Sequence, residues 1–184
     1  SLDSESDGEH ARYAPCKISD LCQKEYDYWA LGHIHTRAIR HADPPIVYPG
    51  NIQGRHMREV GPRGCMLVHV EESGTAKCEF VPLDVLRWQT CCIDASSCRT
   101  ADELLGVFSA QLTELDDTQA GLPRAGRVIG EGRSAAHGQW VSDPLYWTNQ
   151  LRATAQIVSG DRVWIEKVKL CSRPERAEME ATLA

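Results

Sequence analysis

The sequence lacks the features that mark several classes of protein. No run of uninterrupted apolar residues approaches the roughly 18 that a membrane-spanning helix needs. Residues 1–9 are acidic and polar, whereas a secretory signal begins with a basic segment followed by an apolar run. No internal repeat or low-complexity tract is present. We therefore expect a cytoplasmic protein that does not enter the membrane.

The cysteine pattern argues against a disulfide scaffold, although the chain has eight cysteines. There is no Cys-x-x-Cys pair, and Cys91 and Cys92 are adjacent. Cys65, Cys78 and Cys171 lie within apolar runs, where a free thiol behaves as a small hydrophobic residue. We expect reduced thiols that are buried or incidental.

The remaining composition is that of a globular protein. The 184 residues suffice for one ordinary domain or two small ones, and 42% of them are hydrophobic. In the second half the patterns predict strand, helix, strand, helix and strand, an order that indicates a small α/β unit. These predicted elements span residues 87–93, 100–115, 127–129, 143–158 and 163–170.

The first half shows shorter elements. Residues 17–25 fit a short helix whose start Ser19 or Asp20 could cap. Residues 26–31 form an apolar run that predicts a buried strand. A change in composition near Val85 leads us to expect an incomplete sheet before it and a separate α/β unit after it. Further strands are predicted at residues 46–48, 65–70 and 77–83, the last two as an antiparallel pair.

Charge is distributed unevenly along the chain. The formal net charge is −6, which argues against a generally basic nucleic-acid-binding protein. Residues 31–64 nevertheless contain five arginines against two acidic residues, a local charge of +3. The same segment contains His33, His35, His41 and His56. It fits either an anionic ligand or a solvated loop in a slightly basic patch.

The motif Gly-His-Ile-His follows directly after the predicted strand at residues 26–31. His33 and His35 are two positions apart on an irregular segment, so both can turn toward one cavity and each can offer a neutral imidazole to a metal. Imidazole suits Zn²⁺, Mn²⁺ or Fe²⁺, and Gly32 allows a sharp turn out of the strand. A His-x-His pair by itself is a weak signal that favours ordinary surface histidines over a metal site.

Two segments around this motif resemble the last conserved block of the metallophosphoesterase superfamily, in particular its SbcD/YhaO-like DNA-repair exonuclease branch. They are residues 27–35 (Asp-Tyr-Trp-Ala-Leu-Gly-His-Ile-His) and 45–56 (Pro-Ile-Val-Tyr-Pro-Gly-Asn-Ile-Gln-Gly-Arg-His). The resemblance implies an α/β fold in which residues 1–84 are the C-terminal part of a catalytic β-sandwich flanked by helices. Residues 85–172 would then be a small α/β capping domain, and residues 173–184 a charged tail. Residues 13–16, 61–65 and 163–168 also resemble the same branch.

The resemblance also implies a function. It implies a two-metal phosphodiesterase, a DNA repair exonuclease, in which His33 and His35 each bind one divalent ion and Mn²⁺ is the expected metal. DNA, an SbcC-like ATPase and a second copy of the chain are the expected partners. Two alternatives stay open: a metallophosphoesterase that acts on nucleotides or phosphoproteins, and a non-catalytic module that docks the ATPase.

The family's other metal-binding motifs have no counterpart in the sequence. These are its N-terminal Asp-x-His block, its Gly-Asp block, its Gly-Asn-His-Asp/Glu block and one isolated histidine. His10 lies in an acidic segment and matches none of them. The resemblance places these motifs, and the main catalytic histidine, upstream of Ser1. We therefore expect the chain alone to bind Mn²⁺ weakly and to be inactive.

Four residues near the motif are candidates for binding phosphate or DNA. Arg37, Arg55 and Arg58 carry guanidinium groups that can pair with phosphate oxygens, and His56 lies between two of them. The alternative for each arginine is a surface position or an internal salt bridge, for example of Arg58 near Glu59.

The tryptophans could stack on nucleobases, but their positions favour core packing. Trp29 and Trp164 lie in apolar predicted strands. Trp140 and Trp147 flank the start of a predicted helix. We expect all four to pack inside the protein.

Overall fold

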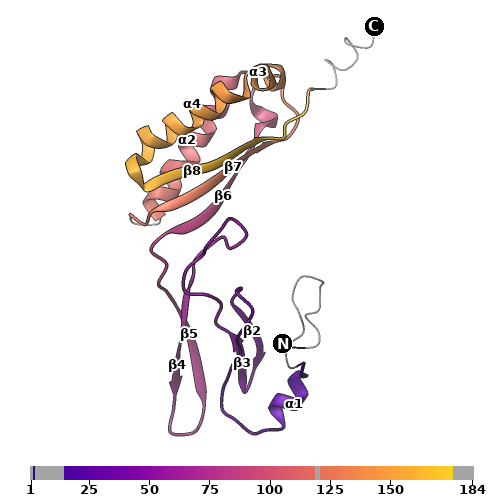
Figure 1. The fold of residues 1–184 in the computed structure, drawn as a ribbon, viewed down its shortest axis with the longest axis vertical. Coiled ribbons are helices and arrows are strands. Elements are labelled where there is room, and N and C mark those ends of the chain that lie inside the picture. Colours follow the sequence, from indigo (N-terminus) through magenta and orange to yellow (C-terminus); the bar gives the residue numbers. More distant parts are fainter. Residues whose placement is uncertain (1, 3–14, 119–120, 176–184) are drawn as a thin grey trace. The chain divides into compact units, whose positions relative to one another are not determined.

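The computed structural model describes residues 2, 15–118 and 121–175. The chain divides into two compact units: unit 1 contains residues 1–55 and 61–84, and unit 2 contains residues 56–60 and 85–184. Both units combine helices and strands, which confirms the α/β class in its general form (Figure 1). Within the described part of the chain, no helix is long and apolar enough to cross a membrane. The predictions for His10, for residues 13–14 and for the tail beyond residue 175 lie outside the described residues.

Unit 1 is built from one short helix and two small sheets. Strand β3 is the centre of the first sheet, pairing in parallel with β1 and antiparallel with β2. Strands β4 and β5 form an antiparallel hairpin, which confirms that prediction. The elements are α1 (Ile18–Cys22), β1 (Trp29–Ala30), β2 (Ala38–Ala42), β3 (Pro45–Tyr48), β4 (Gly64–Val70) and β5 (Ala76–Pro82).

The core of unit 1 surrounds β3. All four residues of this strand are buried, and strands on both sides satisfy its backbone hydrogen-bonding groups. Ile46 and Tyr48 pack with Leu2 and Leu21, and the half-buried Trp29 packs against this cluster. The Leu2 backbone N–H donates to the Tyr48 hydroxyl oxygen at 3.2 Å.

Three local predictions for unit 1 need correction. The apolar run at residues 26–31 is not a buried strand, because only two of its residues pair with β3 and Tyr26 is 61% exposed. Strand β2 was not predicted, since it is an edge strand whose sequence Ala-Ile-Arg-His-Ala does not alternate. Helix α1 has Lys17 as its N-cap, and Asp20 accepts from the Lys17 backbone N–H at 2.9 Å from the third helical position.

Unit 2 follows the predicted order of strand, helix, strand, helix and strand. Helix α4 has Pro144 in its first turn, as predicted, and the Asp143 side chain caps it by accepting from the Tyr146 backbone N–H at 2.9 Å. The prediction lacked the short helix α3 and began β7 three residues late. The elements are β6 (Arg87–Asp94), η2 (Ala95–Ser97), α2 (Ala101–Thr118), β7 (Arg124–Glu131), α3 (His137–Ser142), α4 (Pro144–Ser159), η3 (Gly160–Arg162) and β8 (Val163–Leu170).

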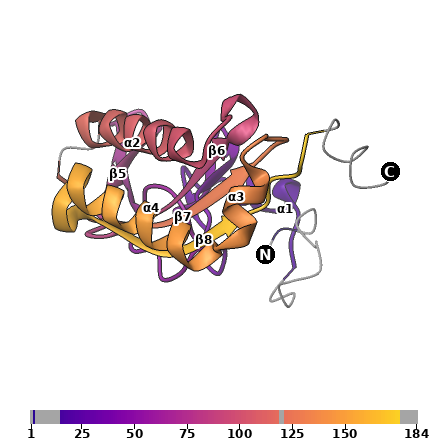
Figure 2. The same cartoon turned by 90° about the horizontal axis from the view of Figure 1, so that it is seen from above.

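The three strands of unit 2 form a parallel sheet in the order β6-β7-β8. Because the spatial order follows the chain order, right-handed connections place α2 and α4 on the same face of the sheet. Figures 1 and 2 show both helices on that face. The core lies between the helices and the sheet, and its largest members are Ile93, Leu104, Phe108, Val128, Trp140, Leu151 and Ile165.

The other face of this sheet carries no helix within the described residues. Side chains alternate along a strand, so Trp164 points away from the helices while its neighbour Ile165 points into the core. Trp164 is 64% exposed, and its predicted core position is wrong. Trp140 is fully buried, and Trp147 packs partly buried against the same core, as expected.

All eight cysteines are free thiols. Cys98 is buried, whereas Cys92 and Cys171 are exposed. Burial, with a smaller contribution from neighbouring Cys92, raises the pKa of Cys91 to about 11.

Candidate functional site

The two candidate metal ligands lie on the loop between β1 and β2 of unit 1. His33 and His35 are both exposed. His33 has a φ of 78°, in the left-handed region that few residues other than glycine adopt. The turn out of the strand therefore falls on His33, and the role predicted for Gly32 is wrong.

The backbone of this loop is held by the turn that follows β3 and by Arg63, which directly precedes β4. The His35 carbonyl oxygen accepts from Arg63 Nη1 at 2.6 Å and from the Asn51 backbone N–H at 3.2 Å. Arg63 is buried and also donates to Asn51 Oδ1 at 3.1 Å. A Cβ atom at Gly50 would lie 2.9 Å from the His35 carbonyl oxygen, so only glycine permits this approach. The position of His35 is thus fixed by neighbours distant in sequence.

The role of Arg63 was not anticipated from the sequence. Its one local signal is its place in the turn Gly-Pro-Arg-Gly. The contact with His35 joins residues 28 positions apart, and only the folded chain brings them together.

Arg55 contacts the ring of His35 directly. Its Nη2 atom lies 3.0 Å from His35 Nδ1. The same Nη2 atom lies 3.5 Å from Nε2, and a guanidinium can only donate, so the ring of His35 is the acceptor in this contact. A metal ion that approached Nδ1 would have to displace the guanidinium.

The other predicted phosphate ligands are divided between the two units. The Arg37 guanidinium stacks over the Phe80 ring of β5, with Cζ 4.0 Å from the ring centroid. His56 and Arg58 belong to unit 2. There His56 Nδ1 accepts from the Arg58 backbone N–H at 3.2 Å, and His56 Nε2 lies 3.9 Å from the buried Glu59 carboxylate. The salt bridge suggested for Arg58 is therefore made by His56 when its ring is protonated.

The donors in this part of the chain do not complete a metal site. Among the described residues, no group of three or more His, Cys, Asp or Glu side chains is placed to hold an ion. Two imidazoles without a carboxylate are a poor match for Mn²⁺, which prefers oxygen ligands.

Two comparisons with known proteins bear on the family of the chain. Residues 88–173 match the family model described as "Metallophosphoesterase YhaO, middle domain". The curated protein "Uncharacterized metallophosphoesterase YhaO" of Bacillus subtilis (strain 168) is 35% identical over 124 residues. Both support the metallophosphoesterase family. Proteins of this family generally use divalent metal ions.

The matches cover the two proteins unequally. The aligned region is 67% of this chain but 30% of the Bacillus metallophosphoesterase. The family model begins within β6 and ends three residues after β8, so it coincides with the α/β part of unit 2. The chain therefore spans about 30% of the length of its metallophosphoesterase relative.

Proposed function

We propose that the chain is part of a metal-dependent phosphodiesterase that cleaves DNA as a repair-type exonuclease. The observation that carries the proposal is the loop with His33 and His35, whose backbone is fixed at the His35 carbonyl by Arg63 and Asn51. A loop that is anchored at its backbone and presents two exposed imidazoles is suited to metal binding, because preorganised ligands lose little conformational freedom on binding an ion. The metallophosphoesterase matches support the same reaction class.

The ligands that complete the metal centre come, in this proposal, from residues outside the chain. His33 and His35 supply two nitrogen donors, and the carboxylates that a hard ion requires are contributed elsewhere. Arg55 orients the His35 ring through its contact with Nδ1, and a metal ion bound at Nδ1 would replace this contact. Residues 1–84 are then the end of the catalytic domain and residues 85–172 a capping domain.

The first test concerns hydrolysis by the intact protein. His33→Ala and His35→Ala should each abolish Mn²⁺-dependent release of nucleotides from linear DNA without lowering the thermal stability of the protein. Exposed His69 in β4 provides a matched control, and His69→Ala should retain full activity. Full activity in either loop variant would contradict the ligand assignment.

The second test concerns the chain by itself. Calorimetry should detect weak binding of Mn²⁺ or none, whereas Zn²⁺ or Ni²⁺ should bind through the two imidazoles and dissociate as pH falls and the rings are protonated. Tight binding of two Mn²⁺ ions by this chain would show that the ligand set is different.

The substrate class is decided by comparing three phosphate esters. The intact protein should degrade linear DNA faster than it hydrolyses a free dinucleotide or a phosphopeptide. A preference for the dinucleotide or the phosphopeptide would favour a metallophosphoesterase of another specificity.

A second candidate function is a docking module for an SbcC-like ATPase. The observation in its favour is a group of exposed apolar side chains near the junction of α3 and α4: Val141, Leu145 and Tyr146. Size-exclusion chromatography of the intact protein with the ATPase tests this function, and Leu145→Lys should prevent co-elution. Co-elution that is insensitive to this substitution would place the docking surface elsewhere.

A further inference from the structure

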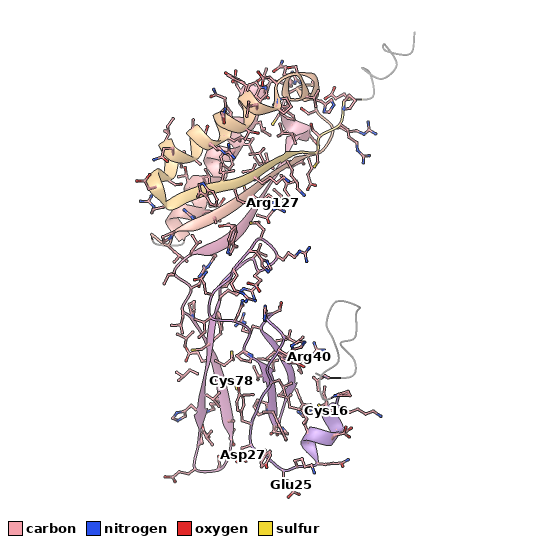
Figure 3. All side chains as sticks on the ribbon, viewed as in Figure 1. Cys16, Glu25, Asp27, Arg40, Cys78 and Arg127 are labelled. Carbon is pink, nitrogen blue, oxygen red and sulfur yellow. The ribbon has the colours of Figure 1, made fainter. Side chains whose placement is uncertain are left out.

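A cavity of about 530 Å³ lies in unit 2, on the face of the sheet without helices. Trp88 of β6, Arg127 of β7 and Glu166 of β8 contribute one residue from each strand. Each alternates with core-facing neighbours, so all three belong to the helix-free face. In Figure 3 the labelled Arg127 lies on the side of the sheet away from α2 and α4. The remaining wall comes from the segment of residues 56–60 that belongs to this unit, through His56, Met57 and Arg58.

The charged groups of the cavity are arranged to receive an anion. Arg127 donates from Nε and from Nη2 to the same Glu166 carboxylate oxygen, at 3.3 and 3.0 Å. This pair is half-buried and fixes the guanidinium, whose Nη1 amino group takes no part in these two bonds. Arg58 adds a second guanidinium, so the residues that line the cavity carry two guanidinium groups and one carboxylate. The Glu59 carboxylate does not line the cavity and lies 3.9 Å from His56 Nε2.

The apolar groups of the cavity are suited to a flat ring. Trp88 and Met57 are both half-buried, so each retains a surface that a ligand can cover. An indole stacks on nucleobases of any sequence, and a thioether packs against aromatic rings. The volume falls within the range of about 300–1,000 Å³ that is typical of small-molecule sites.

We propose that this cavity binds one nucleotide, with the nucleobase against Trp88 and Met57 and the phosphate at Arg58 and Arg127. Guanidinium groups bind phosphate through two parallel hydrogen bonds, which suits a preorganised arginine such as Arg127. The inference deepens the proposed function and rests on it for the source of the ligand. A DNA-degrading enzyme meets nucleotides in two forms, as released mononucleotides and as the terminal residue of a strand.

The binding experiment measures the affinity of the whole 184-residue chain for thymidine 5′-monophosphate. The nucleotide should bind at least about ten-fold more tightly than thymidine, which lacks the phosphate, or inorganic phosphate, which lacks the base. Trp88→Ala and Arg58→Gln should each weaken binding by a similar factor. Arg58 is exposed, so its replacement leaves the fold intact even if the tryptophan variant is unstable.

Two matched variants serve as controls. Trp164→Ala removes an exposed indole of the same sheet that does not line the cavity, and Arg152→Gln removes an exposed guanidinium from α4 on the other face. Both should bind the nucleotide as the parent chain does. Absence of nucleotide binding at millimolar concentration, or equal losses in control and cavity variants, would overturn the proposal.

The source of the nucleotide is identified with a 5′-phosphorylated single-stranded oligonucleotide. Oligonucleotide binding that depends on Trp88 and Arg58 assigns the cavity to a strand terminus, whereas binding of the mononucleotide alone assigns it to a released nucleotide. Both outcomes support a nucleotide site. DNA hydrolysis by the intact protein without nucleotide binding by this chain would remove the cavity assignment and leave the proposed function standing. Nucleotide binding by this chain without DNA hydrolysis by the intact protein would support the cavity assignment and remove the proposed function.

Discussion

A single buried arginine joins two turns of unit 1. Arg63 bridges the His35 carbonyl oxygen and Asn51 Oδ1 with one nitrogen of its guanidinium. A lysine ammonium is a compact point charge on a flexible stem and does not reproduce the planar donor group. We therefore predict that Arg63→Lys loosens the histidine loop and lowers the free energy of unfolding by about 1–3 kcal/mol.

Hydrogen exchange measures this loosening directly. The Asn51 N–H donates to the same His35 carbonyl, so its exchange rate should rise in Arg63→Lys. Arg40→Lys, a replacement at an exposed position of β2, should leave that rate unchanged. Equal exchange in the two variants would mean that Arg63 does not organise the loop.

Thiol reactivity gives a second prediction for individual residues. The exposed Cys92 and Cys171 should be alkylated before the buried Cys98 and before Cys91, whose pKa is raised to about 11 by burial. A raised pKa leaves little thiolate at pH 8, so labelling of Cys91 should accelerate as pH rises toward 11. Peptide mapping by mass spectrometry over a time course distinguishes the sites. Labelling of Cys91 ahead of its neighbour Cys92 would contradict the burial that underlies the shift.

Among the secondary-structure elements, the hairpin of β4 and β5 depends on a glycine at its first position. A Cβ atom at Gly64 would collide with the Val81 carbonyl oxygen of β5 and lie 2.9 Å from Pro82 Cα. The backbone atoms of a paired strand cannot shift without weakening the hydrogen bonds between the strands. Gly64→Ala should therefore destabilise the protein by at least about 1–3 kcal/mol.

A glycine within a helix should show the opposite effect, because its replacement by alanine is expected to stabilise the protein. Gly106 is exposed within α2, and a Cβ atom there would meet nothing within 4 Å. Gly106→Ala should stabilise by about 0.5–1 kcal/mol, because alanine restricts the unfolded chain and favours the helix. Urea unfolding of Gly64→Ala and Gly106→Ala measures the two changes in the free energy of unfolding. A neutral Gly64→Ala would show that the hairpin can separate at its first residue pair.

The elements with a clear hydrophobic pattern were predictable from the sequence, and the exceptions have physical causes. The hairpin and the helices α2 and α4 follow their expected ranges closely. Trp164 was misplaced because alternation identifies two faces of a strand but not the one that helices cover. Strand β2 and helix α3 are short and partly polar, so neither has enough residues to show a period.

The candidate site was predictable only in its local part. The His-x-His motif is a pattern within four residues, whereas the hold of Arg63 on His35 depends on contacts across 28 positions. The cavity proposed to bind a nucleotide could not be predicted from the sequence. It joins Arg58 to residues of three separate strands, and none of those strand residues stands out alone.

For the whole molecule, unit 2 should be able to fold without most of the preceding chain. Every buried residue of its core cluster lies between residues 93 and 165. We predict that residues 85–175, produced alone, unfold cooperatively and give the circular dichroism of an α/β protein. The segment lacks Arg58, so it should bind thymidine 5′-monophosphate more weakly than the whole chain. A non-cooperative transition would mean that residues 56–60 contribute to the folding core as well as to the cavity.

The left-handed backbone at His33 implies a trade-off between stability and activity. A histidine held at a φ of 78° stores strain that a glycine would not, so His33→Gly should raise the melting temperature by about 2–4 °C for each kcal/mol released. The same change would remove a proposed metal ligand. The variant should therefore have a higher melting temperature but no hydrolytic activity. Differential scanning calorimetry tests this, and a lower melting temperature would contradict it. Directed evolution for heat resistance alone would therefore drive position 33 toward glycine, so thermostabilisation of this protein requires a parallel screen for function.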